Sequence, residues 1–288
     1  MIGQESKSRG VMFDLDGTLI LSDRDLGGYH LLPHAITTLN ELDKRGIPFV
    51  ALTNGSAFPA SVQAGKLAAL GLPIDAARLL TPNTVAANVF AERGHWRVLV
   101  LGTAGVREAL EGEGIATASP GDGQACDAVY VAWHPDCTMP DIHAGCEAVI
   151  AGAKFYSASD VPFFAARDGN AFGYSCAING AIARITGVEP EVTGKPSRHA
   201  LGAVAARLGC APAEVLVVGD DPRVETEMAR SGGATGVGVT TGTTSRVEWA
   251  AQPPERAAHH VIDSLAELFG LGLLAESKPS SAPQTRSP

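Results

Sequence analysis

Two aspartates stand two positions apart at the end of a short apolar run near the N-terminus. Residues 11–13, Val-Met-Phe, are followed directly by Asp14, Leu15 and Asp16. In a strand, residues i and i+2 point to the same side, so both carboxylates are expected to project together. Like charges that close make each other harder to ionise. The pair is therefore unfavourable unless a cation neutralises it or one member holds a proton.

Other apolar runs are also followed by groups that can bind an anion or a cation. These groups are Thr53, Asn54 and Gly55 after residues 47–52, Asp220 and Asp221 after residues 215–219, and Lys195 in the stretch GKPS. Carboxylate oxygens are hard ligands that suit Mg²⁺, and Mg²⁺ often binds substrate phosphate as well. A magnesium ion would make an ionised Asp14 tolerable.

Strands and helices are predicted to alternate around these polar groups. Strands are expected at residues 10–16, 47–54, 214–221 and 234–242, and helices at 32–46, 59–71 and 222–232. This alternation favours an α/β fold with a parallel sheet that helices cover on both faces. Because ligands gather at the carboxyl ends of such strands, the polar groups are expected to converge on one site.

The interior of the chain repeats the alternation independently. Strands are expected at residues 97–102, 127–134 and 153–159, and helices at 104–114 and 140–152. The expected organisation is a discontinuous core of residues 1–81 and 186–275, with a second α/β unit at 82–185. The Gly-rich stretch 167–180 is expected to be a loop that enters a helix near Ser175, and the Ser/Pro-rich tail 276–288 is predicted to be disordered.

Composition excludes several classes of protein. Of 288 residues, 45% are hydrophobic and 18% charged, which is enough for a sizeable core, and the net charge of -9 argues against nucleic-acid or anionic-membrane surfaces. No apolar run reaches the roughly 18 residues that span a bilayer, and the N-terminus lacks an apolar signal core. Five cysteines without a CxxC pair predict free thiols in the cytoplasm. The sequence leaves open whether two copies of the chain form a homodimer.

Four motifs in order identify a family resemblance. FDLDGTL, LTN, GKPS and VGDD lie between residues 13 and 221, and together they resemble the haloacid dehalogenase (HAD) superfamily. The second α/β unit stands between LTN and GKPS, which resembles the type-2 (IIA) capped phosphatases, NagD-like and nitrophenylphosphatase-like. The resemblance implies a Rossmann-like core with an inserted α/β cap. It also implies Mg²⁺-dependent hydrolysis of small phosphorylated metabolites through an aspartyl-phosphate.

The resemblance assigns a role to each motif residue. Asp14 is the expected nucleophile, and Asp16 the expected general acid and then general base. The expected Mg²⁺ ligands are Asp14, Asp220 and the backbone carbonyl of Asp16. Phosphoryl oxygens, where transition-state charge spreads, are expected to be held by Thr53, Asn54, Gly55 and Lys195.

Substrate choice is expected to reside in the cap. The family's cap loop resembles TNxD, and here it reads SASD, which keeps Asp160 and places Ser159 where the amide stands. A second family stretch, GLDxxxTY, corresponds to AWHPDCTM, with Trp133 and His134 in the matching places. These four residues are the expected specificity residues, although Trp133 also suits simple packing within the cap.

Other functions and residues stay open. The alternatives are a phosphotransferase such as a mutase, which a type-2 cap disfavours, and a non-catalytic phosphometabolite-binding protein, which does not need both Asp14 and Asp16. A dehalogenase is disfavoured because such members usually lack the second aspartate. Asp221 suits a helix N-cap. Glu225 stands five positions after Asp220, where the family usually has Asp, and its role is left open.

Overall fold

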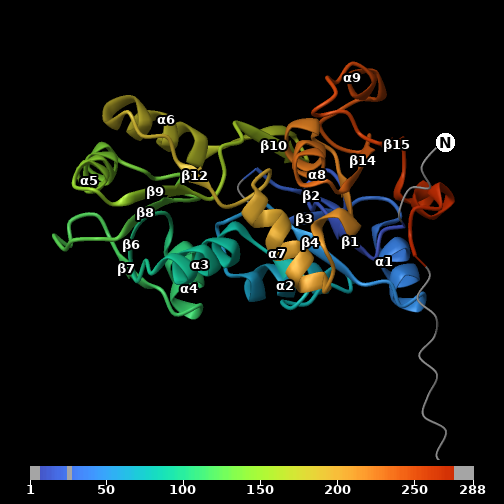
Figure 1. The fold of residues 1–288 in the computed structure, drawn as a ribbon, viewed down its shortest axis with the longest axis horizontal. Coiled ribbons are helices and arrows are strands. Elements are labelled where there is room, and N and C mark those ends of the chain that lie inside the picture. The colour runs from blue at the N-terminus through green and yellow to red at the C-terminus, as the bar shows by residue number, and fades with distance from the viewer. Residues whose placement is uncertain (1–6, 25–27, 276–288) are drawn as a thin grey trace, which may run out of the picture.

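The computed structural model describes residues 7–24 and 28–275, which form three sheets with helices around them (Figure 1). The largest is a six-stranded sheet in the order β15-β14-β13-β1-β4-β5, and every pair of neighbouring strands in it is parallel. In chain order its strands are β1 (Gly10–Phe13), β4 (Phe49–Leu52), β5 (Leu79–Leu80), β13 (Val215–Gly219), β14 (Thr235–Val239) and β15 (His260–Ile262).

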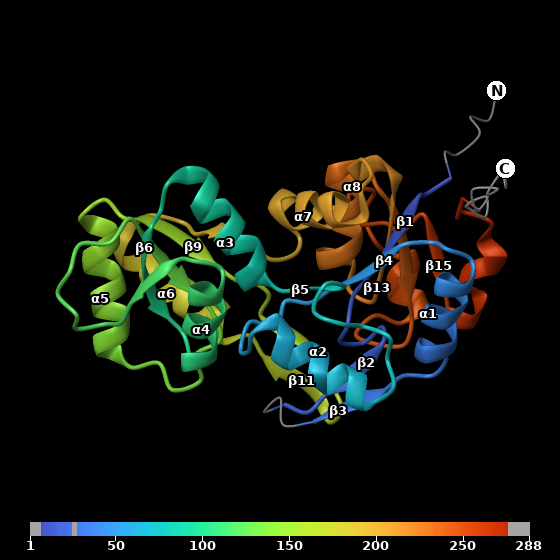
Figure 2. The same ribbon diagram turned by 90° about the horizontal axis from the view of Figure 1, so that it is seen from below.

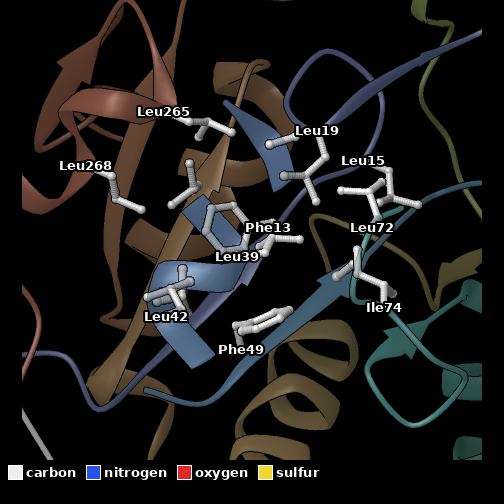
Figure 3. Packing of buried hydrophobic residues seen from close by; sticks show 14 of the residues in the cluster. Phe13, Leu15, Leu19, Leu39, Leu42, Phe49, Leu72, Ile74, Leu265 and Leu268 are labelled. Carbon is white, nitrogen blue, oxygen red and sulfur yellow. The ribbon is translucent and has the colours of Figure 1, made fainter. Parts of the chain in front are cut away.

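Helices bury both faces of this sheet, as the continuous apolar runs predict. Phe13 packs with α1 (Ala35–Lys44), α2 (Ala60–Ala69) and the 3-10 segment Leu265–Leu271, as Figure 3 shows in part. Met12 points to the opposite face, toward α7 (Arg198–Leu208) and α8 (Glu227–Gly232). The two helix layers are visible on either side of the sheet in Figure 2. The predicted α/β fold class is confirmed.

A second, five-stranded parallel sheet forms the other end of the molecule (Figure 2). Its order is β12-β9-β8-β6-β7, with strands β6 (Arg97–Leu101), β7 (Ala116–Ala118), β8 (Ala128–Val131), β9 (Lys154–Ser157) and β12 (Glu191–Val192). One face packs on α3 (Pro82–Arg93) and α4 (Ala104–Gly112), and the other on α5 (Met139–Ile150) and α6 (Tyr174–Thr186).

A third sheet joins the two ends of the molecule. Its order is β11-β10-β2-β3, with β2 (Ile20–Ser22), β3 (Tyr29–Leu31), β10 (Phe163–Ala166) and β11 (Gly169–Phe172). Strands β10 and β11 are an antiparallel hairpin, and β10 continues onto β2 through the pair Ala166 and Ser22. The expectation of a loop is therefore wrong for residues 169–172, which are a strand, while the expected helix begins at Tyr174.

The predicted division into residues 1–81 with 186–275 and residues 82–185 stays a prediction. Strand pairing crosses its limits where β10 meets β2 and where β12 meets β9. The tail 276–288 lies outside the described residues. Within the described part of the chain, none of the helices combines the length and hydrophobicity of a membrane span.

Candidate active site

Three neighbouring strands end at the same edge of the six-stranded sheet. Strand β1 leads into Asp14, β4 into Thr53 and β13 into Asp220, and these strands are adjacent in the order β13-β1-β4. All three side chains line one cavity, together with Asp16, Asn54, Gly55 and Lys195. The structure therefore brings the expected core residues together at the carboxyl ends of parallel strands.

The charged side chains at the base of the cavity, which we call its floor, are Asp14, Asp16, Lys195, Asp220, Asp221 and Glu225. Lys195 supplies the positive charge among them. It precedes α7, whose N-cap Ser197 accepts a hydrogen bond from the backbone N–H of Ala200. The Lys195 side chain is 2% exposed, and its Nζ donates to Asp14 Oδ1 and, at 2.7 Å, to Glu225 Oε1. Burial alone lowers the pKa of Lys195, but the two carboxylates outweigh it and raise that pKa. Lys195 therefore stays an ammonium group.

Among the described residues of the floor, the carboxylates outnumber the one ammonium group, that of Lys195. Burial, followed by the neighbouring charge of Asp14, raises the pKa of Asp220 well above its usual range. Burial also raises the pKa of Asp14 against the opposing effect of Lys195, and it raises the pKa of Glu225 to about 7. Folding therefore brings together more carboxylates on the floor than the described cationic side chains can neutralise.

Glu225 is a site residue whose role the sequence left open. The predicted helix at 222–232 begins as a π-helical turn, Pro222–Thr226, before α8. Such turns are frequent at functional sites. This turn buries Glu225 against Lys195. The second carboxylate oxygen of Glu225, Oε2, accepts a hydrogen bond from the backbone N–H of Asp221 at 3.1 Å. The Asp221 carboxylate itself caps the turn and binds Arg223, as the N-cap interpretation predicts.

Asp16 is held by a residue that the sequence analysis did not identify. The hydroxyl and the backbone N–H of Ser22 both donate to Asp16 Oδ1. Burial raises the pKa of Asp16, and the two hydrogen bonds from Ser22 oppose that shift because they favour the ionised form. Ser22 also accepts a hydrogen bond from the backbone N–H of Arg167, so the strand that holds Asp16 is bonded to the segment that follows β10.

Two glycines leave the space that Asp220 occupies. Gly17 has φ of 94°, which favours glycine, and a Cβ there would collide with Asp220 Oδ2. A Cβ at Gly242 would collide with the same oxygen. Asp220 Oδ2 also accepts a hydrogen bond from the backbone N–H of Thr243 at 2.6 Å. Backbone from two separate loops therefore encloses this carboxylate.

The loop after β4 is linked to the lysine loop. Asn54 Oδ1 accepts from the backbone N–H of Lys195 at 2.8 Å, and its Nδ2 donates to the Lys195 carbonyl at 3.0 Å. Thr53 Oγ1 accepts from the backbone N–H of Gly55 at 2.8 Å. The Asn54 side chain thus aligns Lys195, while the Thr53 hydroxyl proton is available for a bound anion.

The expected specificity residues separate into two pairs. Trp133 and Ser159 line the cavity, whereas His134 and Asp160 are not among its lining residues. His134 Nε2 lies 3.6 Å from Asp141 Oδ2, and Asp160 Oδ1 accepts a hydrogen bond from Asn179 at 3.0 Å. Of these four residues, Trp133 and Ser159 are therefore the two that can contact a substrate in the cavity directly.

The donor set of the floor fits Mg²⁺. Asp14 Oδ2 is buried and has no hydrogen-bond partner among the described residues. An orphaned carboxylate oxygen is costly unless something binds it. It belongs to a cluster of buried carboxylates with raised pKa values, where a divalent cation would supply the missing positive charge. Asp14 and Asp220 are the carboxylates of this cluster that would hold the ion, and the backbone carbonyl of Asp16 stays a predicted third ligand.

Comparison with known families agrees with this geometry. Residues 11–116 match the model of the haloacid dehalogenase-like hydrolases, and residues 192–268 match a second, HAD-hydrolase-like model. The chain belongs to the haloacid dehalogenase-like hydrolases. The two matched segments include Asp14, Asp16, Thr53, Lys195 and Asp220.

Relatives of this HAD-like hydrolase cover nearly the whole chain. The 5'-nucleotidase YutF of Bacillus subtilis is 28% identical over 264 residues, 90% of this chain and 96% of the relative. The sugar-phosphatase AraL of the same organism is 27% identical over 266 residues, 91% and 92% of the two chains. The magnesium complex of a glycerol phosphate phosphatase from Mycobacterium tuberculosis superposes with a TM-score of 0.79 at 24% identity, covering 91% of this chain and 76% of that one.

The predicted family, the haloacid dehalogenase-like hydrolases, is confirmed by the two family models. The named relatives are a nucleotidase and a sugar-phosphatase, in agreement with the predicted enzyme class, phosphoric monoester hydrolase. NagD from E. coli K-12 shares the fold, with a TM-score of 0.78 at 21% identity over 91% of this chain and 98% of that one.

Proposed function

We propose that this hydrolase is a Mg²⁺-dependent phosphatase that cleaves small-molecule phosphate monoesters through an aspartyl-phosphate on Asp14. The observation that carries the proposal is the state of Asp14. One of its oxygens is hydrogen-bonded to Lys195, and the other is buried at the floor of a cavity and has no hydrogen-bond partner among the described residues. The names of the relatives YutF and AraL, a nucleotidase and a sugar-phosphatase, support phosphorylated metabolites as the substrate class.

In the first step, a carboxylate oxygen of Asp14 attacks phosphorus and the phosphorus–oxygen bond to the leaving group breaks. Asp16, whose pKa is raised by burial, gives its proton to the departing oxygen. Lys195 and the Thr53 hydroxyl donate to phosphoryl oxygens as charge spreads over them. When bound, Mg²⁺ neutralises charge on the phosphoryl group and on the carboxylates that hold it.

In the second step, water attacks the phosphorus of the aspartyl-phosphate and Asp16 accepts its proton. The bond between phosphorus and Asp14 breaks, which releases inorganic phosphate and restores both carboxyl groups to their starting state. Asp16 acts as acid and then as base, so its position must suit both steps.

The direct test is release of inorganic phosphate from a panel of small esters, in Mg²⁺ and in excess EDTA. The proposal expects catalytic release in Mg²⁺ and little in EDTA. Transfer of the phosphoryl group to an added alcohol or sugar without phosphate release would identify a transferase instead. Binding of esters without turnover would contradict the proposal outright.

Ser22→Ala tests the positioning of Asp16. The variant loses the hydroxyl that orients the carboxylate, and general acid catalysis typically contributes 10²–10⁴-fold to a rate. Because a poor leaving group needs the proton most, kcat for an alkyl phosphate is expected to fall roughly tenfold or more, and kcat for nitrophenyl phosphate far less. The two esters, assayed on the same preparation, control for folding. An equal loss for both would mean that Ser22 supports the fold rather than the acid.

A further inference from the structure

The walls of the cavity differ in chemistry. Among the described residues that line it, every charged side chain stands on the floor, in the strand-end loops or the turns beside them: Asp14, Asp16, Lys195, Asp220, Asp221 and Glu225. The lining residues between positions 133 and 175 carry no charge. Aromatic and aliphatic side chains dominate this second wall, which we call the aromatic wall: Trp133, Val161, Phe163, Phe164, Ala165 and Tyr174.

The rings of the aromatic wall are packed edge to face. Trp133 meets Tyr174 with ring centroids 4.8 Å apart at 82°, and it meets Phe164 at 6.2 Å and 64°. The backbone N–H of Trp133 donates to Ser56 Oγ at 2.9 Å, and the Trp133 carbonyl accepts from Thr103. Because Ser56 belongs to the loop after β4, the position of Trp133 is tied to the phosphate-binding floor. The wall is therefore preorganised.

The wall continues outward along the β10–β11 hairpin. Phe163 is 45% exposed and Phe172 is 51% exposed, and their centroids are 5.9 Å apart. Phe172 in turn meets Tyr174 at 5.8 Å. An apolar path thus runs from solvent to the floor, and exposed aromatic rings grouped in this way commonly mark a binding surface.

We propose that the preferred leaving group is uncharged and carries a flat apolar ring, which packs against Trp133, Phe164 and Tyr174. The inference rests on the proposed phosphatase function, since it places the phosphoryl group on the floor and the rest of the ester against the aromatic wall. A ring gains both buried apolar area and aromatic contact there.

An anionic leaving group would be rejected by the same arrangement. Among the described residues that line the cavity, Lys195 is the one with a cationic side chain, and it is already bonded to Asp14 and Glu225. A second anion of the substrate would lose water against apolar side chains and would meet the field of the floor carboxylates. The described residues that line the cavity therefore offer no unpaired positive charge to a second anionic group of the substrate.

The test compares three esters of alcohols, so that the reactivity of the leaving oxygen stays similar: benzyl phosphate, 4-carboxybenzyl phosphate and propyl phosphate. We expect kcat/KM for benzyl phosphate to exceed that for each of the others by roughly tenfold or more. Trp133→Leu and Tyr174→Leu should each reduce the ratio of kcat/KM for benzyl phosphate to kcat/KM for propyl phosphate severalfold. Tyr174→Phe, which keeps the aromatic ring, should leave this ratio at the wild-type value.

Trp96→Leu is the matched control, because Trp96 is 58% exposed and is not a lining residue of the cavity. Equal kcat/KM for all three esters would overturn the aromatic preference while leaving the phosphatase function in place. An advantage of benzyl phosphate that survives both leucine variants would overturn the role of the wall. Absence of phosphate release from every ester would instead refute the proposed function itself.

Discussion

Asp14→Asn is expected to reduce phosphate release by roughly 10⁴-fold or more, because removal of a nucleophile typically has an effect of that size. The substitution is nearly isosteric, and the amide cannot form the acyl-phosphate. The fold should survive it. Burial raises the pKa of Asp14, so its ionised form opposes folding at neutral pH when no cation is bound. Removing that charge should leave the unfolding temperature in EDTA unchanged or higher.

The measurement pairs steady-state phosphate release with thermal unfolding of the same preparation. Asp263→Asn makes the same chemical change at a side chain that is 61% exposed and paired with Arg246, and it should keep wild-type turnover. Turnover of pure Asp14→Asn protein at a wild-type rate would exclude Asp14 as the nucleophile. A collapse of the unfolding temperature would mean that Asp14 is needed for structure.

Asp220→Asn is expected to raise the Mg²⁺ concentration needed for half-maximal activity by about a hundredfold or more. Loss of a residue that only supports a metal ligand costs about 10- to 100-fold in affinity, so loss of a charged ligand should cost at least as much. In EDTA the same variant should be no less stable than wild type, because the ionised Asp220 carboxylate is strongly disfavoured by burial and by Asp14.

Thermal unfolding supplies a readout that does not depend on activity. Mg²⁺ should raise the unfolding temperature of the wild type, because an ion that binds the folded state stabilises it, and it should have little effect on Asp220→Asn. Asp221→Asn is the matched control, since its carboxylate faces Arg223 and caps the π-helical turn. Equal responses of wild type and Asp220→Asn to Mg²⁺ would remove Asp220 from the metal site.

The convergence of three strand ends at one edge of the sheet could be predicted from the sequence, and the reason is geometric. In a parallel sheet, residues that directly follow buried strands must lie at one edge, so the positions of Asp14, Thr53 and Asp220 follow from strand assignment alone. Their strands are apolar runs without alternation, which is the pattern of a doubly covered sheet. The same reasoning led to the α/β fold class, which is confirmed.

Contacts between segments far apart in the chain could not be predicted in this way. Ser22 reaches Asp16 because β2 folds back beside it, and no periodicity marks that residue. Glu225 depends on a π-helical turn, whose extra residue shifts the face that a regular helix would present. The β10–β11 hairpin contains Gly169 and is followed by Gly173, and those glycines suggested a loop.

The sequence also could not show which of two adjacent residues faces the cavity. Trp133 and His134 are adjacent, yet one lines the cavity and the other turns toward Asp141. In the same way Ser159 faces the cavity while Asp160 binds Asn179. A motif of two residues cannot say which of them faces the substrate, because that depends on how the end of the strand is oriented.

Chemical trapping of the phosphoenzyme tests the central claim most directly. Wild-type protein mixed with an ester and Mg²⁺ is quenched in acid during turnover, reduced with borohydride, digested and examined by mass spectrometry, since borohydride converts an aspartyl-phosphate to homoserine. The account predicts homoserine at position 14, dependent on both ester and Mg²⁺, and none in Asp14→Asn. Phosphate release under the same conditions with position 14 unmodified, or with the modification at another carboxylate, would contradict it.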